Sequence, residues 1–336
     1  MSAYVTRRLL FMIPTLFGIT LICFTLIQMA PGGPVEQYIS RVTGYAAGKG
    51  GDVKITKEEI KHIEKYYGFD QPAHVRYINW VTNLCKLDLG KSYFYEEPVW
   101  DVIVERFPVS IFFGLTSFIL SYIICIPLGI VKAIKTGSVF DIMSSVMVFI
   151  GYVIPSYALG VLLIIFFCGG SYFDWFPIGQ IVSENFEELN GWWPKTMDFL
   201  HHMTLPLVCY MASEFAFLTI LMKNSLLEEV KKDYVRTALL KGSSHTKAIL
   251  VHALRNALIP LATRLSEIFT IIFASALLIE KVFDIDGMGL LFYNSIHNHD
   301  YNVVMSLIFF SSALTLLGRL FSDILYAIID PRIRFT

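Results

Sequence analysis

Charged residues are scarce in this chain, and their scarcity argues against an ordinary soluble domain. Asp, Glu, Lys and Arg make up 16% of its 336 residues, against 55% hydrophobic residues, and the mean hydropathy is +0.57. Soluble domains average about 25% charged residues. The net charge of −1 also leaves no basic field that would attract nucleic acid. The composition therefore predicts a protein whose solvent is the lipid bilayer.

Patterns that mark metal and nucleotide sites are also lacking. The five cysteines are dispersed without metal-ligand spacing, and we interpret them as small apolar residues, with Cys85 alone in a polar segment. The "GKS" of Gly90–Ser92 resembles the end of a phosphate-binding loop, but Cys85 stands where that loop needs its first glycine. The sequence therefore predicts no nucleotide, cofactor or metal site of its own.

Two groups of residues suggest catalysis only superficially. His201 and His202 are adjacent, so on a helix they point about 100° apart, and a pair at the membrane interface is the favoured interpretation. Ser243, Ser244 and His245 offer a nucleophile and a base, but no third group orients them. We therefore predict that the chain is not an enzyme.

Six apolar runs are long enough to cross a bilayer, which takes about 20 helical residues. They predict an all-α polytopic membrane protein with six transmembrane helices. The first run is expected to stay in the protein, because it is too long for a typical export signal and no A-x-A cleavage site follows it. The runs are Leu9 to Ala30, Val109 to Ile134, Ile142 to Cys168, Thr204 to Met222, Ala257 to Ile279 and Val303 to Ile329.

The placement of Lys and Arg predicts the orientation. Basic residues gather at Arg7–Arg8, Lys132–Lys135, Lys223–Arg255 and Arg332–Arg334, and with six spans these places share one side. The segment Gly169–Met203, on the other side, is acidic. By the positive-inside rule both termini are predicted to be cytoplasmic.

The long segment after the first run has features of a small folded cap. A helix is predicted from Thr56, as N-cap, to Gly68, as stop, and a second amphipathic helix begins at Pro72. The Gly-rich residues 44–52 before them are expected to form a flexible loop. The chain is thus divided into a first transmembrane helix with its cytoplasmic N-terminus (1–30), an outer cap loop with short helices (31–108) and a transmembrane core (109–336).

The core is interrupted by a polar stretch, "DYVRTALLKGSSHTKAILVHALRNALIP", from Asp233 to Pro260. A short helix is predicted over Tyr234–Lys241, ended by Gly242 in a left-handed conformation. Its apolar face, rimmed by Arg236 and Lys241, suits docking into a groove of another protein. A helix lying on lipid head groups is the alternative, and DNA binding is excluded by the tethering to the membrane on both sides. The apolar face consists of Val235, Ala238 and Leu239.

A second helix is predicted to follow the glycine. Ser243 or Ser244 provides its N-cap. Its apolar residues are directed toward the membrane, and these are Ile249, Leu250 and Leu254.

The same stretch resembles the EAA loop of ABC-importer permeases, in the form found in the oligopeptide/dipeptide/nickel family. The matching residues are Arg236-Thr237-Ala238, Lys241-Gly242 and His252 through Leu258 with Pro260. The resemblance extends along the chain through "RRLLFMIPTL", "QMAPGGP", "YGFDQP", "DLGKS", "FPVSI", "IPLGI", "IEKVFDIDGMGLL", "DY" at Asp300-Tyr301 and "DPRIR". The segments "APGGPV", "SYFDWFP" and "MKNSLLEEV" most resemble the Yej-type branch, which is associated with oligopeptides and microcin-C-like peptide conjugates.

This resemblance implies a type I ABC-importer transmembrane domain in a bacterial cytoplasmic (inner) membrane. It implies as partners a second permease subunit, ATPase subunits that bind the ATP, and a substrate-binding protein that delivers a peptide. The segment at about 233–255 would be the coupling helix region. The implied contacts with the ATPase are Arg236, Thr237, Ala238, Leu239, Lys241, Gly242, Arg255 and Asn256.

A self-contained secondary transporter or channel is the alternative function. It would use ionisable residues inside the membrane, and the candidates are Glu214, Arg264, Glu267, Arg319 and Asp323. No inverted repeat of broken helices supports it. Glu214 and Glu267 are also the candidate pathway residues of a permease, although Glu214 is equally compatible with pairing to a neighbouring helix.

Overall fold

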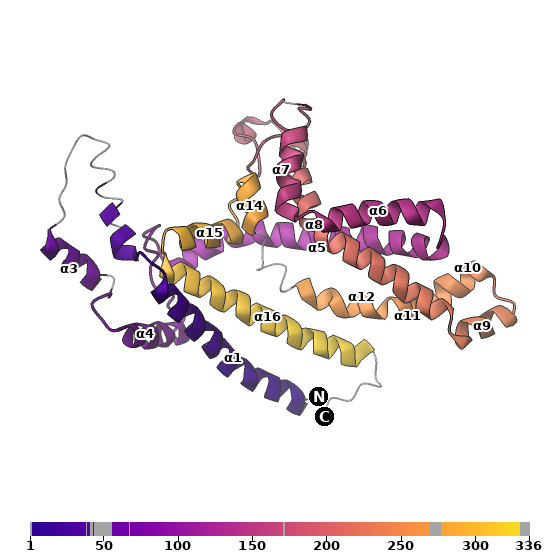
Figure 1. Ribbon diagram of the computed structural model, residues 1–336, viewed down its shortest axis with the longest axis horizontal. Helices are drawn as coiled ribbons and strands as arrows, with labels where there is room; N and C mark the ends of the chain where they lie inside the picture. The colour runs from indigo at the N-terminus through magenta and orange to yellow at the C-terminus, as the bar shows by residue number, and fades with distance from the viewer. Residues whose placement is uncertain are drawn as a thin grey trace. The chain divides into compact units, whose positions relative to one another are not determined.

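The computed structural model describes residues 2–37, 39–40, 43, 56–66, 68–170, 172–268 and 277–329 (Figure 1). Within these ranges the chain is built of helices and turns, and its only β features are two isolated bridges, Lys91 with Pro98 and Cys168 with Phe176. The predicted all-α fold class is therefore confirmed. The longer helices are α1 (Ser2–Met29), α3 (Lys57–Tyr66), α4 (Ala73–Cys85), α5 (Val99–Ile134), α6 (Val139–Val153), α7 (Ser156–Phe167), α8 (Trp192–Val230), α9 (Asp233–Leu240), α15 (Met288–His297) and α16 (Tyr301–Ile329). The shorter ones are η1 (Phe186–Glu188), α10 (His245–Lys247), η2 (Ala248–Ala253), α11 (Leu254–Ala257), α12 (Ile259–Thr263), η3 (Arg264–Glu267) and α14 (Leu277–Phe283).

The chain divides into two compact units. The first unit contains Met1–Pro108 and Leu291–Leu314, and we call it the outer unit because it includes the predicted outer cap loop. The core unit contains Val109–Leu290 and Thr315–Thr336. The helices α5, α15 and α16 each run from one unit into the other.

Within the outer unit, α4 packs against α1 through aromatic side chains. The ring of Tyr77 lies 5.7 Å from that of Phe17 and 5.2 Å from that of Phe24, and its hydroxyl lies 3.0 Å from Thr20 Oγ1. Both predicted helices of the cap are confirmed: α3 ends just before Gly68, whose φ is +73°, and α4 follows Pro72. The predicted flexible loop 44–52 lies outside the described residues.

For five of the six predicted spans, the structure describes the backbone of every residue. Three helices have the length and hydropathy of a membrane span, over Tyr4–Met29, Val99–Ile134 and Tyr301–Leu325. Up to five spans are present among the described residues if α6 with α7 and the two halves of α8 each count as one. The fifth predicted run, Ala257 to Ile279, includes residues 269–276, which lie outside the described ranges. The count of six and the cytoplasmic termini therefore stay predictions.

The third predicted span, Ile142 to Cys168, is broken into two helices. The helices α6 and α7 meet at an angle of 102°. Pro155 explains the break, because it lacks an N–H and disfavours helical backbone at the preceding residue, and Ile154 is extended with φ −78° and ψ 122°.

Two buried apolar clusters hold the core unit together. The first joins α5, α7, α8 and α14, where the rings of Phe113 and Tyr210 stack at 5.3 Å. The second joins α5 and α8 to α9, η2 and α11. Gly129 of α5 permits the close approach to α8, because a Cβ there would lie 2.6 Å from the Cβ of Met222 and 2.9 Å from the carbonyl oxygen of Thr219.

Candidate functional site: the α9–α10 hairpin and its supports

The hairpin begins with α9, which forms within one residue of the predicted limits. Gly242 ends it with φ +87°, as predicted, while its N–H donates to the carbonyl of Leu239 at 2.9 Å and that of Ser243 donates to Ala238 at 3.1 Å. No atom lies within 4 Å of the position of an added Cβ on Gly242. A side chain at this residue would therefore strain the backbone rather than collide with this chain.

The second arm of the hairpin begins at Ser244, one of the two predicted caps. Its hydroxyl accepts from the N–H of Lys247 at 3.4 Å. The helix then widens into the π-helical segment η2 before α11 restores α-helical geometry. The predicted second helix is therefore present, with a local i→i+5 pattern that sequence periodicity did not indicate.

The two faces of α9 differ from the prediction in two respects. Val235 is buried in the second apolar cluster, against residues such as Ile249 and Ala253, so it is not available to a partner. Ala238 is half-buried, Leu239 is 37% exposed and Leu240 is 82% exposed. The apolar spacing of the helix identified the side that packs on its own chain, and it missed Leu240.

The polar residues of the predicted coupling set fall into two groups. Arg236, Thr237, Lys241 and Arg255 are exposed. Asn256 is instead half-buried and interacts with the side chains of Glu229 and Tyr234. The exposed residues 236, 237 and 239–241 of α9 and its C-cap are called the α9 surface below.

The end of α8 is fastened to α9 through the carboxylate of Glu229. Its two oxygens accept from Lys232 Nζ and from the hydroxyl of Tyr234, each at 2.5 Å. The hydrogen bond to Glu229 raises the pKa of Lys232, and burial followed by the hydrogen bond to Glu229 raises the pKa of Tyr234. Together with Asn256, these bonds make the end of α8, α9 and α11 one connected element.

A group of buried charged side chains joins α8 to α5 and α6, at Lys223 of α8. The sequence analysis did not find it. Lys223 Nζ of α8 lies 2.7 Å and 2.8 Å from the carboxylate oxygens of Asp141. Lys132 Nζ of α5 lies 3.3 Å from Asp141 Oδ1 and donates to Ser144 and Ser145 at 2.8 Å and 2.7 Å. Lys132 is fully buried. We call Lys132, Asp141 and Lys223 the charged joint.

Basic residues near a predicted span end were interpreted only as indicators of topology, so the charged joint was overlooked. Its members are separated by nine and 82 residues along the chain. No pattern of neighbouring residues predicts such a contact. Asp141 in the first turn of a helix was the one available signal, since acidic residues are favoured there.

The candidate pathway residues are only partly described. Glu214 Oε2 lies 3.9 Å from Arg264 Nη2, and the guanidinium of Arg264 lies 4.0 Å above the ring of Phe217. This contact favours the pairing alternative for Glu214 and does not test a pathway role. The side chain of Glu267 lies outside the described residues.

A second buried carboxylate was also missed. Glu280 is fully buried, and it accepts from the hydroxyl of Tyr210 at 3.1 Å and the N–H of Leu290 at 2.8 Å. Ser110 lies 3.4 Å away and also accepts from the N–H of Met288 at 2.8 Å. The segments "FPVSI" and "IEKVFDIDGMGLL" are thereby joined.

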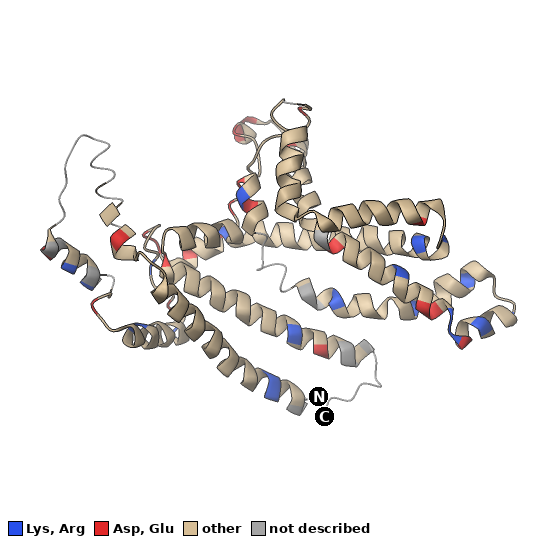
Figure 2. Cartoon of the chain, viewed as in Figure 1, with Lys and Arg blue, Asp and Glu red and all other residues tan. Residues whose placement is uncertain are grey.

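Charge is distributed very unevenly over these elements (Figure 2). Both signs gather where α8 ends and α9 begins, whereas α7 carries no charged residue. The described part of the chain contains no group of three His, Cys, Asp or Glu side chains able to hold a metal ion.

Comparison with known families decides which class of protein uses this arrangement. Residues 125–335 match the family described as binding-protein-dependent transport system inner membrane component, and residues 1–114 match the N-terminal part of such membrane components. The chain belongs to this family.

Proteins that match the permease over its whole length support this family assignment. It is 43% identical to the peptidoglycan transport system permease protein YejB of Agrobacterium fabrum (strain C58 / ATCC 33970), over 100% of this chain and 99% of the relative. It is 40% identical to the inner membrane ABC transporter permease protein YejB of Escherichia coli O157:H7, with the same coverage. It is 32% identical to the oligopeptide transport system permease protein AppB of Bacillus subtilis (strain 168), over 100% of both chains.

These findings confirm several predictions. The permease is a multi-pass protein of the inner membrane, it resembles the Yej-type branch, and its relatives are transport subunits rather than enzymes. The α9 surface, the charged joint and Glu280 all lie within the residues that match the main family model.

Proposed function

We propose that this permease forms, with a second homologous permease, the membrane pathway of an ATP-driven, binding-protein-dependent importer of peptides or peptide conjugates. ATPase subunits dock on the α9 surface from the cytoplasm, and a substrate-binding protein delivers the peptide from the other side. The permease holds no cofactor, because ATP is bound by the ATPase subunits. The observation that carries this proposal is the α9–Gly242–Ser244 hairpin, which is anchored to its own core on one face and exposed on the other.

The α9 surface has the composition of a docking site. Leu239 and Leu240 are exposed apolar side chains beside Arg236 and Lys241, so an apolar centre has a basic rim. Such a surface suits a groove in another protein, since buried centres of interfaces are apolar and their rims polar.

The supports behind the surface suit the transmission of movement. A helix pushed by closing ATPases moves the membrane helices only if it is firmly connected to them. Glu229 ties α9 and α11 to the end of α8, Val235 buries α9 in the cluster shared with α5, and Asp141 ties α8 to α5 and α6. We infer that a displacement of α9 is passed through these contacts to the membrane helices.

The substrate class follows from the relatives. One is named for peptidoglycan and another for oligopeptides. Peptide segments occur in both kinds of molecule, so a peptide, free or conjugated, is the substrate class that we propose for this permease.

The outer cap is proposed to meet the binding protein. Helix α4 is fastened to α1 through Tyr77, so it is a structured surface and not a loose linker. Deleting Thr56–Gly68, which removes α3, should weaken docking of the binding protein and peptide uptake. Unchanged docking and uptake would contradict this role.

The test of the coupling role uses the reconstituted complex of both permeases and the ATPases, with ATP hydrolysis measured with and without binding protein and peptide. Gly242→Val and Ala238→Glu should abolish the stimulated hydrolysis while leaving the permease inserted. A β-branched residue resists the positive φ at Gly242 by about 1–2 kcal/mol, and an unpaired carboxylate in a desolvated groove costs about 1–3 kcal/mol. Lys241→Ala is the matched control and should be mild, because exposed ion pairs contribute about 0–1 kcal/mol.

The same preparation separates the two candidate functions. If both variants keep normal stimulated hydrolysis and uptake, the hairpin rests on lipid and the coupling role is wrong. A secondary transporter would import peptide in proteoliposomes without any ATPase, and it would not retain an ATPase or a sister permease during purification.

A further inference from the structure

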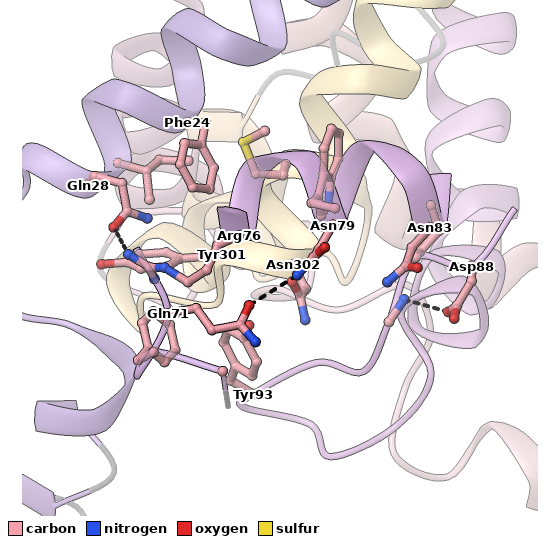
Figure 3. Close-up of a pocket in the computed structure, with 17 residues that line it drawn as sticks. Phe24, Gln28, Gln71, Arg76, Asn79, Asn83, Asp88, Tyr93, Tyr301 and Asn302 are labelled. Carbon is pink, nitrogen blue, oxygen red and sulfur yellow. Dashed lines mark hydrogen bonds between the residues drawn. The ribbon is translucent and has the colours of Figure 1, made fainter. Parts of the chain in front are cut away.

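A cavity of about 210 Å³ lies within the outer unit, beside the end of α1 (Figure 3). Four of the segments that carry the family resemblance contribute to its lining, although the proposed function assigns none of them a role. Gln28 comes from "QMAPGGP", Phe69 and Gln71 from "YGFDQP", Asp88 from "DLGKS" and Tyr301 from "DY".

Hydrogen bonds hold two of these segments, "DLGKS" and "DY", next to each other. The hydroxyl of Ser92 donates to the carboxylate of Asp300, which also accepts from the N–H of Phe94 at 3.2 Å. Asn302 donates to the carbonyl of Lys91 at 2.8 Å. The side chains next to these bonds therefore have fixed positions at the edge of the cavity, as the residues of a binding site need.

The cationic end of the cavity is Arg76. Its Nη2 donates to Gln28 Oε1 at 2.5 Å, and its guanidinium lies 4.6 Å from the ring centre of Phe69. Its Nε is buried and has no hydrogen-bond partner among the residues that the structure describes. Buried donors are normally paired, so the unpaired Nε points to an acceptor that the described residues do not supply.

The other end of the cavity is acidic. Asp88 accepts from the N–H of Gly90 through one oxygen, and in Figure 3 it lies at the opposite end of the labelled group from Arg76. Amide side chains lie between the two charges, where Asn79 donates to Gln71 at 3.1 Å. Aromatic rings, such as those of Phe69 and Tyr301, and further amides, such as those of Asn83 and Asn302, complete the wall.

We propose that this cavity binds the carboxyl-terminal end of a peptide, with the carboxylate on Arg76 and the backbone amides on the Asn and Gln side chains. The proposal rests on the proposed import of peptides and adds a substrate subsite in the outer unit. An arginine fork recognises a carboxylate with two donors, and side-chain amides both donate to and accept from peptide bonds. A volume below the roughly 300–1,000 Å³ of ordinary ligand pockets suits one end of a peptide rather than the whole molecule.

A phospholipid headgroup is the competing occupant. It would place its phosphate on Arg76, but it has no peptide groups to satisfy the row of amides, and its acyl chains require an apolar groove leading from the site. The amide-rich lining therefore favours the peptide.

The experiment uses the complete permease–ATPase complex in nanodiscs, without nucleotide or binding protein, and measures binding of Ala-Ala-Ala by calorimetry. The free acid should bind at least tenfold more tightly than Ala-Ala-Ala amide. Arg76→Gln should remove that difference, and Lys86→Gln, an exposed basic residue just after α4 that does not line the cavity, should leave it intact. Equal binding of acid and amide to the unaltered complex, or a difference that survives Arg76→Gln, would overturn the proposal.

A labelling experiment tests the same site without altering Arg76. In a variant with Cys85→Ser and Asn83→Cys, a charged maleimide should react with the new thiol, and Ala-Ala-Ala acid should slow that reaction severalfold. If added phosphatidylethanolamine slows it and the tripeptide does not, the cavity is a lipid site and the proposal is wrong.

Transport by the unaltered complex separates this inference from the proposed function. Peptide uptake driven by ATP, combined with no binding in the cavity, would refute the subsite alone. No uptake of any peptide would refute the proposed function.

Discussion

Replacing Asp141 by Asn removes the carboxylate that lies between the two lysines of the charged joint. In the unaltered protein it lies 2.7 Å from Lys223 Nζ and 3.3 Å from Lys132 Nζ. The variant keeps the size and an acceptor oxygen for the N–H of Gly137, but it leaves two ammonium groups facing each other. Breaking a buried ion pair by removing one partner costs about 3–5 kcal/mol. We expect a value near the lower end, because the side chain of Lys223 is 19% exposed and its ammonium group can move toward water.

A loss of this size is large beside the roughly 5–15 kcal/mol that stabilises a typical domain. It should appear as a lower unfolding temperature of the purified complex, followed by fluorescence, and as weaker stimulation of ATP hydrolysis by binding protein and peptide. Membrane complexes do not unfold in two states, so the variants are ranked by temperature and not converted to free energy. Glu228→Gln is the matched control, since its side chain is 77% exposed on α8, the helix that carries Lys223, and its loss should change neither quantity.

A triple variant separates stability from transmission. Changing Lys132 and Lys223 to Met together with Asp141→Asn removes the unpaired charges, and such apolar replacements are often neutral or stabilising. The unfolding temperature should recover, while stimulated hydrolysis stays low because α8 is no longer tied to α5 and α6. An Asp141→Asn complex with normal unfolding temperature and normal stimulation would refute the reasoning, and full recovery of stimulation in the triple variant would refute the transmitting role.

Three further predictions concern other parts of the chain. Gly287→Ala should lower the unfolding temperature strongly, because an added Cβ would lie 2.6 Å from both carboxylate oxygens of buried Glu280, whereas Gly151→Ala, with no atom within 4 Å, should not. Burial raises the pKa of Asp300, so its contribution to the stability of the protein is fully present below the ordinary pKa of Asp and is lost as the pH rises through the raised pKa. The unfolding temperature, measured from about pH 4 upward, should therefore fall less steeply with pH in Asp300→Asn than in the unaltered protein. A cysteine placed at Asn190 in a cysteine-free background should react with an impermeant maleimide only from outside the cell, and reaction only from the cytoplasm would refute the predicted topology.

Local signals predicted the short helices well. Thr56, Pro72 and Gly68 delimited α3 and α4, and Gly242 ended α9, because caps, proline and positive-φ glycine act within a few residues. Pro155 was a similar local signal in the third apolar run, and the sequence analysis did not use it. Hydropathy measures whether a segment suits lipid, and it says little about whether the segment is straight.

Contacts between distant segments could not be predicted in this way. The bond between Lys223 and Asp141 and the cavity lined by Arg76 and Tyr301 both join side chains far apart in the chain. Val235 shows a related difficulty, which is to predict the direction in which a helix face is turned. Its apolar spacing placed it on a helix face, but only the packed structure reveals that this face is turned toward η2 and α8.

The π-helical segment Ala248–Ala253 has a consequence for tolerance to changes of length. Its i→i+5 bonds accommodate one residue more than an α-helix holds over the same rise, so the helices on either side keep their rotational phase despite the extra residue. Deleting one residue here would convert the segment to ordinary α-helix and leave Asn256 facing Glu229. The same deletion within α8 would turn everything beyond it by about 100°. The segment is therefore a place where the chain can lose one residue without turning α11 relative to the residues before it.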